Sequence, residues 1–78
     1  MNTAPIREAI HAAAIDQCII MIAERLERAA AVAKSAVACM QEGKREQAVT
    51  IVMGVEEMVL HVNTFLNAAS LIRRNAKL

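Results

Sequence analysis

The sequence has very few of the residues that build turns, disulfide frameworks or aromatic cores. It contains two Gly, one Pro and one Phe, and it has no Trp or Tyr. A β-sandwich needs many turn residues and strand-forming aromatic side chains, so the composition excludes that fold. Two Cys and two His are too few for a disulfide framework or a dedicated metal cage. Because 56% of the residues are apolar, a disordered chain is excluded as well.

The sequence also lacks an excess of charge of one sign and a long apolar run. Nine basic and eight acidic side chains give a formal net charge of +1. This balance indicates neither a nucleic acid nor an anionic membrane surface as a partner. The longest uninterrupted apolar run covers residues 18–23, far short of the ~20 residues that cross a bilayer, so we expect no membrane span. The N-terminal residues lack a signal-peptide pattern, which predicts a cytoplasmic protein with reduced cysteines.

Two long stretches of strong helix formers make up most of the chain. Ala, Leu, Ile, Met, Glu and Arg dominate residues 6–41, which contain no Gly or Pro. Thr3 and Pro5 favour a helix start near residue 4, and Gly43 favours a helix end. We therefore predict one all-α domain over residues 1–78, an antiparallel helical hairpin of two long helices. The expected bounds are a helix at about 4–41, a turn at about 42–45 and a helix at about 46–75.

Apolar residues recur at alternating spacings of three and four along both predicted helices, which is typical of helices that pack against each other. We expect Gly54 to let the helices approach closely opposite Ala33; the alternative is a tolerated helix defect. The stripe predicted for the first helix is Ala12, Ile15, Ile19, Ile22, Leu26, Ala29, Ala33, Ala36 and Met40. The stripe predicted for the second helix is Ala48, Ile51, Val55, Met58, Val62, Phe65, Ala69 and Ile72.

Further apolar side chains fall outside these two stripes. A lone hairpin would leave them in water, and monomeric proteins rarely expose large contiguous apolar patches. We therefore predict a homodimer that forms a four-helix bundle, with the second face filled by another copy or by a helical partner protein. The alternative is scattered surface hydrophobes, which are normal singly. The predicted partner-binding residues are Ile6, Ile10, Ile20, Met21, Val49, Met53 and Leu60.

The residues with reactive side chains form no known catalytic or metal-binding motif. His61 has Glu57 one turn before it, but one His with one or two carboxylates is too few ligands for a transition metal. Cys18 and Cys39 lack the Cys-x-x-Cys spacing of redox thiols. There is no Gly-rich phosphate loop and no nucleophile-and-base pair. We expect no cofactor, no metal and no catalytic residue, and we predict that the protein is not an enzyme.

Two parts of the chain resemble known helical families. Residues 19–66 resemble a hairpin of the flagellin-export chaperones, which implies a small export chaperone or adaptor that binds another protein. Residues 10–34 resemble the first helix of the all-helical chorismate mutases, which implies a small enzyme as the alternative function; a cluster of Arg side chains in a pocket would favour it. The first resemblance is carried by Ala33-Lys34-Ser35-Ala36, Glu42-Gly43, Gln47-Ala48 and Phe65-Leu66-Asn67, and the second by Ile15-Asp16, Ile22-Ala23-Glu24-Arg25 and Val32-Ala33-Lys34.

Overall fold

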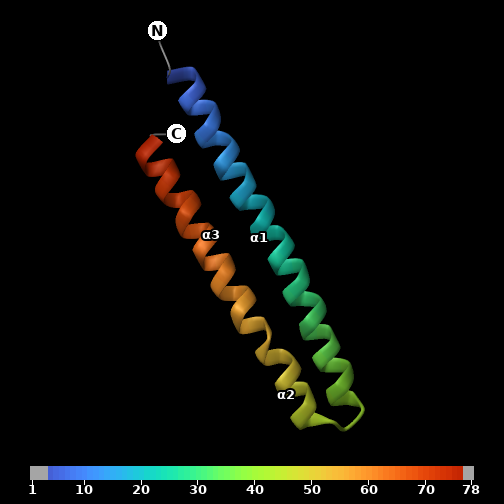
Figure 1. Cartoon of the computed structure of the whole chain (residues 1–78). Coiled ribbons are helices and arrows are strands. Elements are labelled where there is room, and N and C mark those ends of the chain that lie inside the picture. The colour runs from blue at the N-terminus through green and yellow to red at the C-terminus, as the bar shows by residue number, and fades with distance from the viewer. Residues whose placement is uncertain (1–3, 77–78) are drawn as a thin grey trace.

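The chain folds into a long helical hairpin (Figure 1). The computed structural model describes residues 4–76, so Thr3, the predicted cap, lies outside the described residues. Helix α1 (Ala4–Gln41) forms the first arm, and α2 (Arg45–Met53) and α3 (Val55–Ala76) together form the return arm. Both α2 and α3 contact α1, and α1 extends past the end of α3. The predicted all-α antiparallel hairpin is confirmed.

Gly43 permits the turn between the two arms. Its φ of +83° lies in the left-handed region, which L-residues with a side chain rarely adopt. The Gly43 N–H donates to the Met40 carbonyl at 2.9 Å, and the Lys44 N–H donates to the Cys39 carbonyl at 3.2 Å. This pair of hydrogen bonds is a Schellman motif, which satisfies carbonyls left free at the end of α1. The sequence therefore located the helix stop correctly.

Gly54 divides the return arm into α2 and α3. Its backbone stays right-handed, with φ −64° and ψ −19°, and its N–H donates to the Ile51 carbonyl at 3.1 Å. Gly54 is exposed, and a Cβ built on it would meet only the Ile51 carbonyl oxygen, at 3.3 Å. The prediction of close packing opposite Ala33 is therefore wrong. Gly54 marks a local break between α2 and α3, and no atom of α1 lies within 4 Å of the position that its Cβ would take.

The stripe predicted for the return arm is confirmed as its contact surface. Ala48 is buried, and the following positions of the stripe from Ile51 to Ile72 are all half-buried. Phe65 is among the half-buried residues, so the one aromatic ring is only partly removed from water. The contact surface is therefore regular along the arm but shallow.

The stripe predicted for α1 is correct at some positions and wrong at others. Ile15, Ile22, Ala29, Ala33 and Ala36 are half-buried or buried, as predicted. Four further members of the predicted stripe are exposed, including Ile19 at 56%, Leu26 at 51% and Met40 at 47%. In each case the residue one position earlier in the sequence is half-buried and lies against the return arm instead. The exposed four are Ala12, Ile19, Leu26 and Met40, and the residues in their places are His11, Cys18, Arg25 and Cys39.

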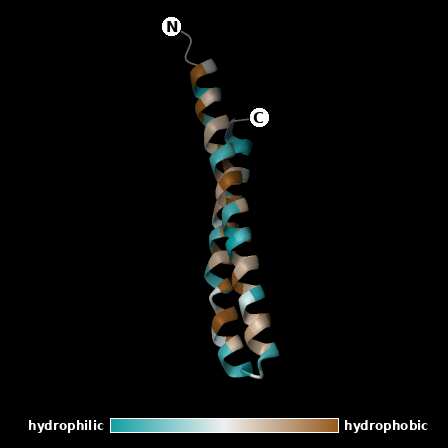
Figure 2. Ribbon diagram, turned by 90° about the vertical axis from the view of Figure 1, so that its right-hand side faces the viewer, coloured by the Kyte–Doolittle hydropathy of each residue, from teal (hydrophilic) through white to brown (hydrophobic). Residues whose placement is uncertain are grey.

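The resulting core is small. Among the residues whose burial is described, the buried apolar side chains are Ala29, Ala36 and Ala48, at 6–8% exposure. Hydrophobic and hydrophilic residues alternate along both arms in Figure 2. The molecule measures 66 × 14 × 13 Å with a radius of gyration of 18.1 Å, whereas a compact chain of this length has a radius of gyration of about 12 Å. The hairpin is therefore an elongated rod with a thin contact between its two arms.

Candidate protein-binding face

An outer stripe of apolar residues runs along α1 beside the contact with the return arm. Its members alternate by four and three positions, so they line one side of the helix. Every member of the stripe, from Ile19 to Met40, is apolar. We call this set the outer stripe of α1: Ile19, Ala23, Leu26, Ala30, Ala33, Val37 and Met40.

The return arm contributes four exposed apolar residues to the same side of the hairpin. Val49 and Val52 are 49% and 42% exposed, and Val59 and Leu66 are 45% and 55% exposed. Val52, Val59 and Leu66 are spaced by seven residues, so they share one side of the arm. Together with the outer stripe of α1 these four residues form what we call the apolar face.

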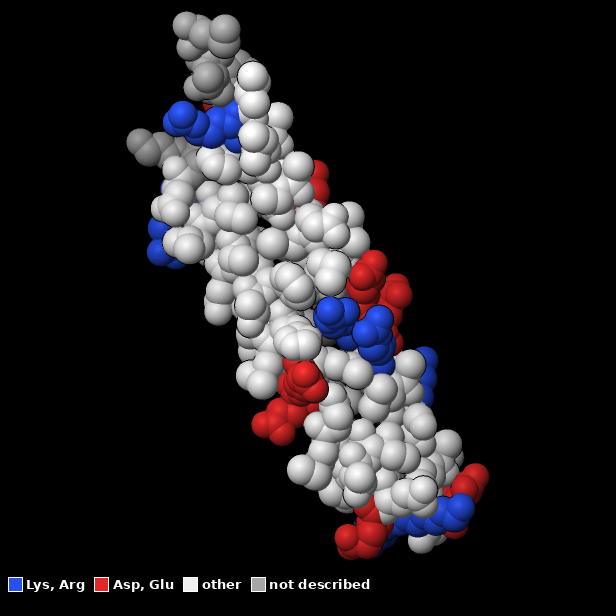
Figure 3. All heavy atoms as spheres, viewed as in Figure 1, with Lys and Arg blue, Asp and Glu red and all other residues white. Residues whose placement is uncertain are grey.

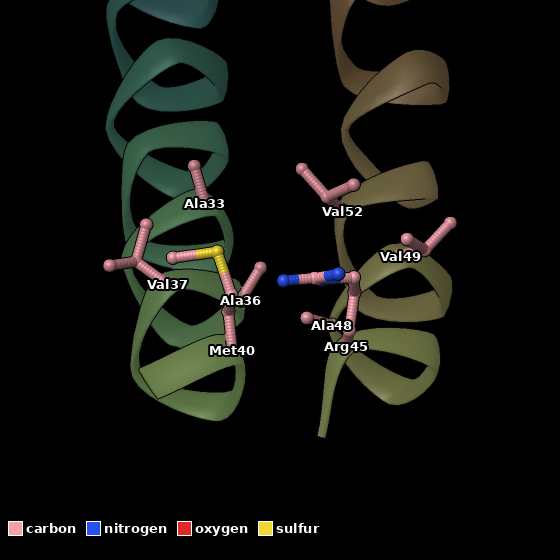
Figure 4. Close-up of a pocket in the computed structure, with 8 residues that line it drawn as sticks. All are labelled: Ala33, Ala36, Val37, Met40, Arg45, Ala48, Val49 and Val52. Atoms are coloured by element: carbon pink, nitrogen blue, oxygen red, sulfur yellow. The ribbon is translucent and has the colours of Figure 1, made fainter. Parts of the chain in front are cut away.

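Two grooves show that the two arms contribute to one face. The groove near the turn has a volume of about 360 Å³, and in Figure 4 the side chains of Met40 from α1 and Arg45 from α2 extend into it from opposite arms. The second groove, of about 500 Å³, lies toward the other end of the hairpin, where Ile19 and Leu66 both line it. The groove near the turn is lined by Ala33, Ala36, Val37, Met40, Arg45, Ala48, Val49 and Val52.

Six of the seven predicted partner-binding residues are exposed, but the set does not gather on the apolar face. Met53 and Ile6 are the most exposed, at 63% and 62%. Val49 is the one member of the set that lines the groove near the turn, and Met21 is half-buried. Ile20 and Leu60 follow Ile19 and Val59 directly, and the step of one residue turns them away from the face. Ile10, at 61% exposure, lines neither of the two grooves.

Sequence reasoning missed most of the apolar face because it assigned Ile19, Leu26 and Met40 to the contact within the hairpin. The signal was present, since both of the overlapping stripes of α1 repeat with spacings of three and four. The apolar stripe of the return arm is also wider than one row of residues. Val52, Val59 and Leu66 each come directly after a member of that stripe. A stripe wider than one contact row is typical of a helix that touches two neighbours.

A polar cleft of about 210 Å³ lies beside the contact between the arms, lined by other residues than those of the apolar face. Arg25 and Arg28 reach it from α1, and His61 and Glu57 reach it from α3. His61 Nε2 lies 3.9 Å from Glu57 Oε1, and both side chains are largely exposed. The Nε atom of Arg25 is buried without a hydrogen-bond partner. On the face shown in Figure 3, basic and acidic side chains also lie close together near the middle of the hairpin.

No metal site emerges from residues 4–76. Within that range, no group of three or more His, Cys, Asp or Glu side chains could hold a metal ion. Cys18 and Cys39 are free and half-buried, and the Cys39 sulfur lies 3.5 Å from the Lys44 carbonyl oxygen near the turn. Both thiols lie in the contact between the arms.

The return arm is long and apolar enough to meet a length-and-composition test for a membrane span. Residues Arg45–Asn75 contain an 18-residue window with a mean hydropathy of 1.3 and no buried residue. The expectation of no membrane span was based on uninterrupted apolar runs, whereas this window is apolar on average although polar residues interrupt it. Two adjacent carboxylates, Glu56 and Glu57, lie within the arm and are exposed.

Comparisons with protein-family models, with curated proteins and with solved structures found no match to this chain.

Proposed function

We propose that this chain is a non-enzymatic, self-associating helical protein that binds a helical protein partner through helix–helix contacts, in the manner of a small export chaperone or adaptor. The observation that carries the proposal is the ratio of exposed to buried apolar side chains. Over residues 6–75, the buried apolar residues are alanines, whereas fourteen large apolar side chains are exposed, from 42% for Val52 to 63% for Met53. The proposal includes a cytoplasmic location for the protein.

Helix–helix recognition, by a second copy or by a partner helix that competes with it, would use the apolar face as its groove. Such a helix anchors itself with apolar side chains every three or four residues, which matches the spacing of the outer stripe of α1. The row of Ala30 and Ala33 lets another backbone approach closely. Met40 has an unbranched, flexible side chain at the groove near the turn, so it adapts to partner side chains of different shape.

Solution mass tests the self-association on which the proposal depends. Sedimentation equilibrium across micromolar to submillimolar concentrations should give a dimer or larger assembly of the 8.5 kDa chain. Circular dichroism on the same samples establishes that the chain is helical. A folded, helical monomer throughout this range would contradict the proposal, because the hairpin would then be stable with its exposed apolar side chains in contact with water.

A second candidate function is supported by the polar cleft. Arg25 and Arg28 lie together there, and clustered Arg side chains are the feature that favours a small all-helical enzyme of the chorismate-mutase type. Glu57 lines the same cleft and would repel an anionic substrate. Titration with a small dicarboxylate, followed by amide chemical shifts, tests this function. Saturable shifts at the cleft that disappear in Arg28→Gln would support it, and unchanged spectra at millimolar ligand would exclude it.

A further inference from the structure

We infer that the apolar face is covered by a second copy of this chain, face to face, so that two hairpins form a four-helix bundle. This inference rests on the proposed self-association and goes further by naming the surface. It replaces the predicted contact residues, of which Val49 alone belongs to the face, with the outer stripe of α1 and with Val49, Val52, Val59 and Leu66 of the return arm.

The orientation of α1 is the first argument. In a hairpin that functions alone, α1 should turn its most apolar row toward the return arm, because that contact is its one source of burial. The structure instead places Cys18 and Arg25 in the contact and leaves the neighbouring Ile19 and Leu26 at 56% and 51% exposure. A helix whose apolar stripe extends beyond one contact row is suited to a bundle, in which it packs against two neighbours.

The exposed surface area is the second argument. The hairpin exposes 6024 Å², whereas a folded monomer of its mass exposes about 4,700 Å². The excess is roughly 1,300 Å² per chain, or about 2,600 Å² for two chains. Obligate homodimers bury on the order of 2,000–5,000 Å² in total. An interface of this size would bring the exposed surface of each chain to the value expected for its mass.

The distribution of charge favours the apolar face, rather than the opposite side of the hairpin, as the surface that the second copy covers. The middle of the face consists of Leu26 and Val59 with small neighbours, and Arg45 and Arg73 line its two grooves toward the ends. An apolar centre with a polar margin is the usual anatomy of a stable interface. The polar cleft, by contrast, presents Arg25, Arg28 and Glu57, and covering it with a second copy would remove these charged groups from water.

Four Glu substitutions at exposed apolar positions test the inference. Leu26→Glu and Val59→Glu place a carboxylate on the apolar face, whereas Ile20→Glu and Leu60→Glu place one at a neighbouring position of similar exposure, 49% and 58%. Glu is at least as strong a helix former as the Leu, Ile and Val residues that it replaces, and exposed sites normally tolerate such changes. We expect the face variants to raise the dimer dissociation constant about 100-fold or more, and the control variants to change it less than about 3-fold.

Sedimentation and circular dichroism on matched samples separate the outcomes. Dissociation of the face variants, or their unfolding at concentrations where the controls remain folded, supports the inference, because neither occurs at a site that faces water. Val37→Glu, at a 48% exposed site nearer the turn, repeats the test if Leu26→Glu cannot be purified.

Three results would overturn the inference. If the parent associates but Ile20→Glu and Leu60→Glu dissociate it while the face variants do not, the surface is wrong and the proposed self-association stands. If the parent is a folded monomer, both proposals fail. If the parent is monomeric but floats with vesicles of zwitterionic lipid, and Leu26→Glu abolishes the flotation, the occupant of the face is a membrane.

Discussion

Replacing Arg25 with Met should stabilise the hairpin, although it removes a charged residue from the middle of a long helix. Arg25 is half-buried in the contact between α1 and the return arm, and its Nε atom is buried without a hydrogen-bond partner. A buried donor without a partner costs roughly 1–3 kcal/mol. Met keeps the length of the Arg stem beside Met58, which lines the same cleft, while the unpaired donor is removed.

We expect a gain of about 1 kcal/mol, at the lower end of that range, because Arg25 is only half-buried and the rest of its guanidinium group keeps access to water. For a chain of this size such a gain raises the melting temperature by roughly 4–8 °C. Thermal melts at one fixed protein concentration measure the change, since association would otherwise shift the midpoint.

Arg28→Met is the matched control for this substitution. Arg28 lies three residues further along the same helix and is exposed, so its replacement should change stability by less than about 0.5 kcal/mol. If Arg25→Met melts at or below the temperature of the parent, the reasoning is refuted, because the guanidinium group must then contribute a favourable contact that outweighs the buried Nε atom.

The remaining predictions concern the contact between the arms and the two glycines. Phe65→Ala should cost about 2 kcal/mol in urea unfolding, less than the roughly 3–5 kcal/mol of a fully buried Phe, because the ring is half-buried; a loss below that of exposed Asn67→Ala would contradict its place in the contact. Gly43→Ala should cost roughly 1–2 kcal/mol, since it forces a side chain into the left-handed region. Gly54→Ala should instead stabilise by about 0.5 kcal/mol, because its right-handed backbone accepts Ala and the nearest atom to the new Cβ, the Ile51 oxygen, lies at 3.3 Å; a lower unfolding midpoint would show that this contact cannot relax.

Much of this protein was determined by the sequence alone. The absence of turn residues and aromatics, together with one Gly between two helix-forming stretches, was enough to predict an all-α hairpin and its turn at Gly43. These features depend on local propensity and on the left-handed conformation that Gly adopts without strain, so they need no knowledge of distant contacts. The stripe of the return arm from Ala48 to Ile72 was also predictable, because its spacing has no competitor as regular and as apolar.

The rotation of α1 about its own axis was decided only by the tertiary structure. Two stripes on this helix, displaced by one residue, both satisfy the three-and-four spacing, and a sequence pattern cannot say which of them meets the return arm. The prediction assigned Ile19, Leu26 and Met40 to the contact because they are the more apolar choice, whereas the structure places Cys18, Arg25 and Cys39 there. Gly54 was misassigned for a related reason, since the same residue can mark either close packing or a helix break. Both outcomes depend on how the two arms pack in three dimensions, because periodicity defines the rows on a helix and the neighbouring helices determine which row is covered.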